Sequence, residues 1–217
     1  MNVCYIVGAG DFGTPFSPSD GDLVIAADGG FEHLKKHNIR CDLLIGDFDS
    51  ITDLPSSIER ITYPVEKDFT DTALALYEGE RRGYTDFVLL GCTGGREDHT
   101  FANYCLLSEA RLRGLRAKMV SKSVTAFIIN NEKTRVKCDT GCHFSAFAFG
   151  GRATGITISG LYYEAEDLTL TPSCHLAASN LFKENAAEVS VECGELLIIV
   201  ESENAEIEFF DFFPKST

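Results

Sequence analysis

The chain has 217 residues, of which 44% are hydrophobic, and it carries a formal net charge of −14 at pH 7. The apolar fraction is that of an ordinary globular protein and excludes a disordered chain, and the length suits one large domain or two small ones. The negative charge makes nucleic acid and anionic membrane surfaces poor partners, because both are bound through clustered Lys and Arg. ATP is compatible with this charge, since a bound cation reverses the local field.

Two further features concern the cellular compartment. No stretch of 18 or more apolar residues occurs, and the first apolar run, residues 2–7, lacks a preceding basic segment and is too short for a signal peptide. The eight cysteines are scattered, without the paired spacing of a zinc site. We therefore expect a cytoplasmic protein with no membrane partner, whose cysteines are free thiols.

Over residues 1–120, short apolar segments alternate with amphipathic segments. This alternation predicts strands joined by helices, in a mostly parallel sheet that is covered on both faces. The predicted strands are residues 2–7, 23–27, 43–45, 60–63, 87–90 and 117–121, and the predicted helices are residues 31–37, 71–82 and 98–113.

From about residue 122 the helical periodicity disappears. Short apolar runs recur at intervals of roughly 8–12 residues, separated by Gly, Asn and Asp, which is typical of an antiparallel sandwich or barrel. The predicted strands here are residues 126–130, 134–137, 143–149, 153–159, 167–170, 187–191 and 195–201. The predicted fold class is α/β, with an N-terminal three-layer α/β/α domain over residues 1–122 and a C-terminal antiparallel β-sandwich domain over residues 123–217.

The first chemical motif, Gly8-Ala9-Gly10-Asp11-Phe12-Gly13, matches the dinucleotide fingerprint G-x-G-x-x-G. Asp28 lies twenty residues beyond Gly8, where a ribose-binding acid is expected. However, the residues that follow the motif are turn formers, and the next strand begins by Leu23, which leaves no room for a crossover helix. We therefore favour a glycine-rich loop close to a nucleotide or to the next strand over a dinucleotide site.

Carboxylates follow the second and third predicted strands. Asp28-Gly29-Gly30 ends the second strand, where glycines allow a ligand to approach the backbone or simply allow a tight turn. Asp47 and Asp49 follow the third strand, and at this spacing in an extended chain both side chains reach one cation. An Asx-turn is the alternative use of these two residues.

The segment Lys67-Asp68-Phe69-Thr70-Asp71 leads into the second predicted helix. Either Thr70 or Asp71 begins this helix, and a helix N-terminus attracts a phosphate as well as a capping carboxylate. Lys67 either contacts phosphate oxygens or is a solvated loop residue.

Another glycine-rich segment follows the fifth predicted strand. Gly94 and Gly95 expose backbone N–H groups, Arg96 adds a guanidinium suited to phosphate, and Asp98 is a candidate cap of the next helix. The segment lacks the Gly-Lys-Ser/Thr of a Walker A loop. All these segments follow strands of one parallel sheet, at the edge where such sheets bind ligands.

Together these motifs resemble those of the thiamine pyrophosphokinase family. The family patterns A-D-G-G, G-D-F-D-S, K-D-x-T-D and G-G-R-x-D-H stand here at residues 27–30, 46–50, 67–71 and 94–99. Residues 160–163, Gly-Leu-Tyr-Tyr, resemble the family's G-L-K-Y, and Ser179-Asn180 resembles its S-N. Tyr162 replaces the usual Lys, Glu164 the usual Pro, and Ala178 the usual Gly.

The resemblance implies an enzyme that transfers the diphosphoryl group of ATP to the thiamine hydroxyl, giving thiamine diphosphate and AMP. It implies a homodimer with thiamine at the subunit interface. Mg²⁺ would be held by Asp47, Asp49 and Asp71, which are also the expected catalytic residues. The residues expected to bind ATP are Asp28, Gly29, Lys67, Thr70, Gly94, Gly95, Arg96 and Asp98, and those expected to bind thiamine are Leu161, Tyr163, Ser179 and Asn180. Because the chain has no Trp, a Phe or Tyr must stack on the thiamine.

Two other functions remain open at this stage. The N-terminal motifs address ATP rather than its acceptor, so a diphosphokinase that acts on another heterocyclic alcohol, such as a hydroxymethylpterin, would carry them too. A noncatalytic sensor of nucleotide or thiamine would keep the fold but has no need for so many carboxylates.

Overall fold

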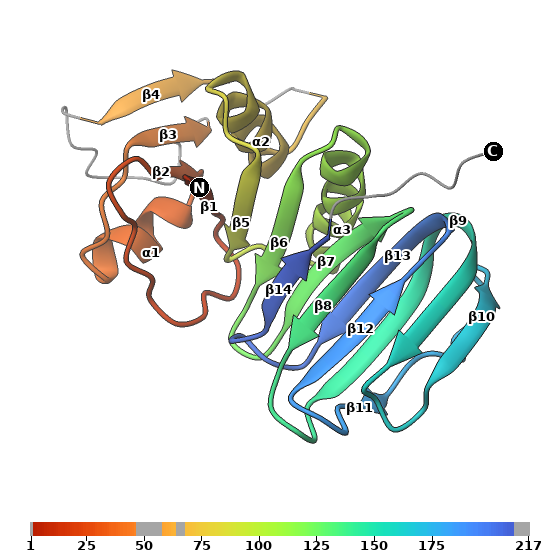
Figure 1. Cartoon of the computed structure of the whole chain (residues 1–217). Helices are drawn as coiled ribbons and strands as arrows, with labels where there is room; N and C mark the ends of the chain where they lie inside the picture. Colours follow the sequence, from red (N-terminus) through yellow and green to blue (C-terminus); the bar gives the residue numbers. More distant parts are fainter. Residues whose placement is uncertain (1, 47–57, 64–67, 211–217) are drawn as a thin grey trace. The chain divides into compact units, whose positions relative to one another are not determined.

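The computed structural model describes residues 2–46, 58–63 and 68–210. The chain divides into two compact units, Met1–Lys122 and Ser123–Thr217, which we call the N-terminal and C-terminal units. Figure 1 shows a sheet flanked by helices in the first unit and strands alone in the second.

The sheet of the N-terminal unit is entirely parallel, with the strand order β6-β5-β1-β2-β3-β4. The predicted strands and the observed ones differ at their ends by at most one residue. The observed strands are β1 (Val3–Val7), β2 (Leu23–Ala27), β3 (Leu43–Gly46), β4 (Glu59–Thr62), β5 (Asp86–Leu90) and β6 (Arg116–Val120).

Helices cover both faces of this sheet. Helix α1 (Gly30–Lys36) packs Phe31 and Leu34 against Val24 and Leu44 on one face. On the other face, Gly79 of helix α2 (Asp71–Arg81) lies against Phe87 and Cys4, so close that a side chain there would overlap both. Helix α3 (Glu97–Leu112) packs beside α2 and against β6. The strands β2 and β3 therefore bury both of their faces, which explains their continuous apolar runs, whereas the edge strand β4 is mostly exposed.

The strand order reverses direction at β1. The chain first adds β2, β3 and β4 on one side of β1, and it then places β5 and β6 on the other side. The loops that follow β1 and β5 thus lead away from a shared point at the carboxyl edge of the sheet. In open α/β sheets, ligands bind at such a switch point.

All strand pairs that the structure describes within the C-terminal unit are antiparallel. The strand order is β14-β8-β12-β9-β13-β7, and β10 and β11 also pair with β9. These strands are β7 (Thr125–Asn130), β8 (Lys133–Lys137), β9 (His143–Ser159), β10 (Ala165–Leu170), β11 (Asn180–Leu181), β12 (Ala186–Ser190), β13 (Cys193–Val200) and β14 (Glu206–Phe209).

The long strand β9 corrects the prediction of two separate strands, residues 143–149 and 153–159. Its first half pairs with β13 and its second half pairs with β10 and β12. Gly150, with φ +68°, and Gly151 lie between the halves and let the strand bend without a break. One strand therefore belongs to both layers of the sandwich.

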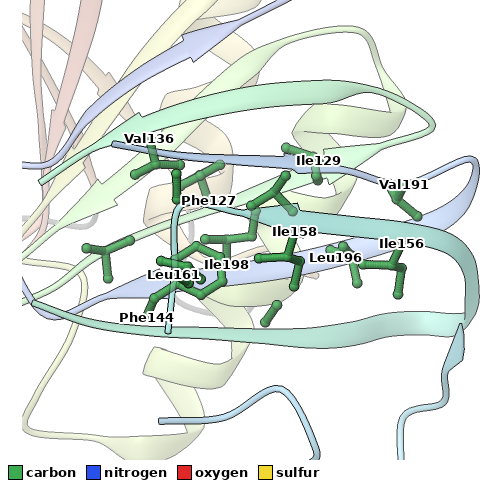
Figure 2. Close-up of a cluster of buried hydrophobic side chains, with 14 of the residues drawn as sticks. Phe127, Ile129, Val136, Phe144, Ile156, Ile158, Leu161, Val191, Leu196 and Ile198 are labelled. Carbon is green, nitrogen blue, oxygen red and sulfur yellow. The ribbon is translucent and has the colours of Figure 1, made fainter. Parts of the chain in front are cut away.

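A single apolar core lies between these layers. Its members include Phe127 of β7, Ile158 of β9 and Ile198 of β13, which Figure 2 shows among the buried side chains. Burial of each such side chain favours folding by about 1.5–3 kcal/mol. Strands β11 and β14 were not predicted, because β11 has only two residues and β14 lies in an acidic stretch without a continuous apolar run.

Two expectations about the whole chain can be compared with the structure. All eight cysteines are free, which confirms the prediction of thiols. Among the residues that the structure describes, no helix is long and apolar enough to cross a membrane.

Candidate functional site

The loop that follows β1 lies directly against the loop that follows β5. The backbone N–H of Gly8 donates to the Leu90 carbonyl at 2.8 Å, and Gly10 donates to Gly91 at 2.7 Å. A side-chain carbon at Gly8 would lie 2.7 Å from the Gly91 oxygen, closer than real contacts of this kind. The glycines of the G-x-G motif therefore bring two loops together. The chain enters β2 with no intervening helix, so the dinucleotide alternative lacks the helix that it requires.

Asp28 follows β2 at the same edge of the sheet, next to the ends of both neighbouring strands. Its backbone, in the left-handed region at φ +48°, donates from N–H to the Ile45 carbonyl at 2.8 Å. Gly46 lies against its Cα atom, and a side chain at Gly30 would overlap the Val7 carbonyl. The strand that leads to Asp47 and Asp49 thus ends beside Asp28.

Three of the predicted site residues, Asp47, Asp49 and Lys67, lie outside the described residues. Within the described ranges, no group of three or more His, Cys, Asp or Glu side chains could hold a metal ion. The described carboxylates of the predicted metal and nucleotide site are Asp28 after β2, Asp71 at the start of α2 and Asp98 in the first turn of α3.

Helix α2 begins at this edge. Thr70 is its N-cap, and the Thr70 hydroxyl accepts a hydrogen bond from the Ala73 N–H at 3.2 Å. Asp71 is the first helical residue, where the helix dipole favours a negative charge or a bound phosphate. The predicted helix start is therefore confirmed, with Thr70 as the capping residue and Asp71 as the first residue of the helix.

Cys92 joins these segments, a role that no sequence motif predicts. Its Sγ donates to the Leu90 carbonyl at 3.3 Å and also contacts the Gly8 backbone and the Thr72 hydroxyl. The Nδ2 of Asn103 in α3 donates to the Cys92 carbonyl at 2.8 Å. Burial raises the pKa of the Cys92 thiol to about 12, so the thiol stays protonated at neutral pH. The loops after β1 and β5 are thus fixed to the start of α2 and to the middle of α3.

The loop after β5 ends in an exposed ion pair. Gly94 and Gly95 have φ of +76° and +70°, which favours glycine at both positions. The Arg96 guanidinium contacts the Asp98 carboxylate at 2.6 Å and 3.1 Å. These hydrogen bonds lower the pKa of Asp98. The prediction that Asp98 caps α3 is wrong. Arg96 occupies the N-cap position, and Asp98 is already part of the helix. The pair holds the guanidinium at the helix start.

The predicted acceptor residues lie together in the C-terminal unit, around a cavity of about 410 Å³. Tyr163, Glu164, Leu176 and Asn180 line this cavity. Leu161 does not line the cavity: it is fully buried in the core of the C-terminal unit and pairs across the strands with Phe182.

Ser179 and Asn180 approach the same region from β11. The Ser179 N–H donates to the Ser145 hydroxyl at 3.0 Å, and the Ser179 backbone has φ +59°. The side chain of Asn180 is buried and bonded to the backbone of Tyr163. The structure therefore brings all four predicted thiamine residues into one part of the sandwich.

Comparisons with known proteins divide the chain in the same way. Residues 18–119 match the model of the thiamin pyrophosphokinase catalytic domain, and residues 128–198 match that of the thiamin pyrophosphokinase vitamin B1 binding domain. The chain belongs to the thiamin pyrophosphokinase family. The predicted family, fold class and enzyme class are thereby confirmed, and the vitamin B1 binding domain favours thiamine over a hydroxymethylpterin as the acceptor.

Individual relatives agree with this assignment. The thiamine pyrophosphokinase of Bacillus subtilis (strain 168) is 27% identical over 161 residues, which are 71% of this chain and 75% of that protein. A crystal structure of thiamine pyrophosphokinase from Bacillus subtilis matches 93% of this chain and 100% of its own, with 23% identity and a TM-score of 0.82. The thiamin pyrophosphokinase family protein from Enterococcus faecalis gives 26% identity and a TM-score of 0.81, over 93% of this chain and 99% of that chain.

Proposed function

We propose that the N-terminal unit binds ATP with Mg²⁺ and that the C-terminal unit binds thiamine. The diphosphoryl group of ATP then passes to the thiamine hydroxyl, and AMP leaves. The observation that carries this proposal is the meeting of the Gly8–Gly10 loop, the Gly91–Gly95 loop and the start of α2 at the switch point of the sheet. Polyphosphates suit such a place, because backbone N–H groups and a helix N-terminus converge there.

The carboxylates of this edge suit Mg²⁺, which prefers hard oxygen ligands and keeps several waters. Asp71 and the two carboxylates of Asp47 and Asp49 would hold the ion, with Asp28 beside the chain that leads to them. When bound, Mg²⁺ neutralises charge on the phosphate oxygens. The role of the protein is then to keep these carboxylates at one edge of the sheet, where Thr70 rather than Asp71 caps α2.

Donors from the loop after β5 hold the phosphate chain. Gly94 and Gly95 present backbone N–H groups, Arg96 presents a planar guanidinium, and Asp98 orients that guanidinium through two hydrogen bonds. Gly29, Lys67 and Thr70 complete the ATP contacts. Because phosphoryl transfer has a loose transition state, most of the catalysis comes from positioning and charge stabilisation rather than from a strong base. Asp71 is the carboxylate that receives the hydroxyl proton.

The cavity lined by Tyr163 holds the thiamine ring system. Tyr163 provides the flat aromatic surface, Ser179 and Asn180 form the β11 side, and Leu161 supports the cavity from the core. Tyr162, Tyr163 and Leu176 expose large apolar surfaces. Contiguous apolar surface of this kind marks an interaction site, and we propose that a second copy of the chain covers it in a homodimer with thiamine at the interface. The free thiols fit a cytoplasmic location.

The test is product analysis with purified protein, ATP, thiamine and Mg²⁺. We expect AMP and thiamine diphosphate in equal amounts and no reaction when thiamine is omitted or Mg²⁺ is chelated. A hydroxymethylpterin in place of thiamine is the control acceptor and should give no AMP. Formation of ADP, or thermal stabilisation by thiamine without any AMP, would overturn the proposed reaction.

A further inference from the structure

Tyr163 is the most exposed large hydrophobic side chain in the described part of the chain, with 76% of its surface accessible. It lines the 410 Å³ cavity together with Leu176 and Glu164. An exposed ring at the wall of a cavity is suited to stacking on a flat, cationic heterocycle. Such a ring binds tightly only if its orientation is already fixed before the ligand arrives. What fixes the ring is therefore part of the binding site.

The backbone of Tyr163 is held at both ends by one side chain. The Tyr163 N–H donates to the Asn180 Oδ1 atom at 3.0 Å, and the Asn180 Nδ2 atom donates to the Tyr163 carbonyl at 2.7 Å. Oδ1 also accepts the Leu181 N–H at 2.9 Å. These partners determine the orientation of the amide, since its oxygen faces two N–H groups and its nitrogen faces a carbonyl. Asn180 is only 6% exposed, and three of its four hydrogen-bonding positions are used by backbone groups.

The strand pairing explains why a side chain is needed at this point. Leu161 pairs with Phe182, and the Tyr162 N–H donates to the Leu181 carbonyl at 3.0 Å. The next backbone partner would come from residue 180, but the Asn180 backbone pairs with Phe144 of β9 instead. The Asn180 amide therefore takes the place of a peptide group and extends the pairing by one more step.

A second hydrogen bond joins the two ends of the turn that carries Tyr163, residues 160–164. The Gly160 N–H donates to the Glu164 Oε1 atom at 3.1 Å, and Gly160 has φ +81°. A side chain at Gly160 would overlap the Ala186 carbonyl. The turn from Gly160 to Glu164 thus starts from a fixed point, and Asn180 fixes the residue that faces the ligand.

We propose that Asn180 is a positioning residue, which orients the Tyr163 ring for thiamine through the Tyr163 backbone and does not itself bind thiamine with its amide. This inference rests on the proposed function, in which thiamine occupies the cavity beside Tyr163. It changes the role of Asn180 from a contact to a support. Because the ring binds substrate and transition state alike, loss of its orientation raises KM for thiamine and leaves kcat nearly unchanged.

A double-mutant cycle separates the two roles of Asn180. The variants are Asn180→Ala, Tyr163→Ala and the double variant, each assayed for AMP formation at varied thiamine concentration. We expect Asn180→Ala to raise KM for thiamine about tenfold in the native background, which corresponds to ~1.4 kcal/mol. In the Tyr163→Ala background the same change should raise KM less than about twofold, because no ring remains to be oriented. An equal effect in both backgrounds would overturn the proposal.

Asn180→Asp provides a second test, which also serves if the alanine variant fails to fold. The new carboxylate would place a charged oxygen against the Tyr163 carbonyl, whereas its protonated form restores the donor. KM for thiamine in this variant should fall toward the wild-type value as the pH is lowered. Glu164, the other carboxylate at the cavity, is present in every variant, so its contribution to the pH dependence of KM for thiamine is the same in all of them. The matched control is Asn185→Asp, because Asn185 is an exposed asparagine whose Oδ1 only accepts from Thr140.

The possible results are distinct. A KM that depends on pH in the same way for Asn180→Asp, Asn185→Asp and wild type would overturn the positioning role. Absence of AMP formation by the wild-type protein would instead overturn the proposed function. If the wild-type protein is active but Asn180→Ala raises KM for thiamine equally in the Tyr163→Ala background, only the positioning role of Asn180 is overturned.

Discussion

Gly10 lies so close to the carbonyl oxygen of Thr93 that no side chain fits between them. The same residue donates its N–H to Gly91 at 2.7 Å, so it joins the loop after β1 to the loop after β5. These loops form the switch point at which we place the phosphates of ATP. The backbone contacts of Gly10 therefore link the fold to the proposed binding site.

Gly10→Ala should separate the two loops. The added carbon would lie 2.9 Å from the Gly91 carbonyl and closer still to that of Thr93, and backbone atoms cannot move aside cheaply. We expect a loss of about 2–3 kcal/mol in the free energy of unfolding and a higher KM for ATP. Urea unfolding and steady-state kinetics measure the two effects. Gly151→Ala is the control, because a side chain there meets open space. Equal stability of the two variants would contradict the close approach.

Thr70 and Asp71 should show opposite effects when they are changed singly. Thr70→Ala removes the hydrogen bond to the Ala73 N–H and should lower the free energy of unfolding by about 1 kcal/mol, with a higher KM for ATP but little change in kcat. Asp71→Asn keeps the helix start intact and should lower kcat at least about 100-fold with nearly unchanged Tm. Thermal melts measure the stability of each variant, and AMP assays measure its activity. An unfolded Asp71→Asn variant would show that this residue serves the helix rather than the metal.

Arg96→Ala should impair the use of ATP without affecting stability. Both side chains of the Arg96–Asp98 pair are more than 60% exposed, and exposed pairs contribute less than about 1 kcal/mol to folding. We expect kcat/KM for ATP to fall about 10-fold to 100-fold, as for loss of a guanidinium that contacts phosphate. The matched control is Arg113→Ala, an exposed arginine that follows the other end of α3 and pairs with Glu80. Similar kinetics for the two variants would argue against a phosphate contact by Arg96.

Protonation of Glu78 should lower the free energy of unfolding of the N-terminal unit in acid. The Glu78 carboxylate accepts three hydrogen bonds of 2.7 Å from Arg81 and Arg82, and the bonds from Arg81 are the main reason why its pKa falls to about 2. Because this pKa lies below its ordinary value of 4.5, the interaction stabilises the fold fully above pH 4.5 and is lost as the pH falls toward 2. Glu78→Gln should therefore cost about 2 kcal/mol at pH 7 and progressively less below pH 4.5.

Urea unfolding at pH 7 and pH 3.5 tests this dependence on Glu78. Glu109→Gln is the comparison, since Glu109 is a more exposed glutamate of the same unit that pairs with Arg113. A difference between Glu78→Gln and wild type that stays constant across the two pH values would show that the carboxylate charge is not what stabilises this region.

The sequence predicts the elements of the N-terminal unit well because their periodicity is local. Buried strands such as residues 23–27 are continuous apolar runs, and the cap of α2 is a short-range pattern of Thr followed by helix formers. The periodicity did not predict which distant residues the glycines contact. Gly10 meets Thr93 across more than 80 residues of chain, and Cys92 contacts Thr72 and Gly8 only after the sheet has formed. Contacts of this kind depend on the topology, which periodicity does not specify.

In the C-terminal unit, the sequence predicted most of the strands but not the continuity of β9. Its alternating runs predict strands, but β9 is interrupted by two glycines that normally end a strand, so the sequence favours two strands there. The thiamine contact expected of Asn180 stays a prediction. The pair Ser-Asn indicates a polar contact, and only the hydrogen bonds to Tyr163 show that the contact is made with the protein itself.

The bend in β9 has a consequence for how the C-terminal unit unfolds. Because this strand supplies partners to β13 in one layer and to β10 and β12 in the other, neither layer can separate without removing a strand from its neighbour. Local opening that spares half of the sandwich is therefore disfavoured, and slow hydrogen exchange should extend over both layers with nearly one free energy. The Tyr163 cavity, whose wall includes Ile158 of β9, would then persist until the whole sandwich unfolds.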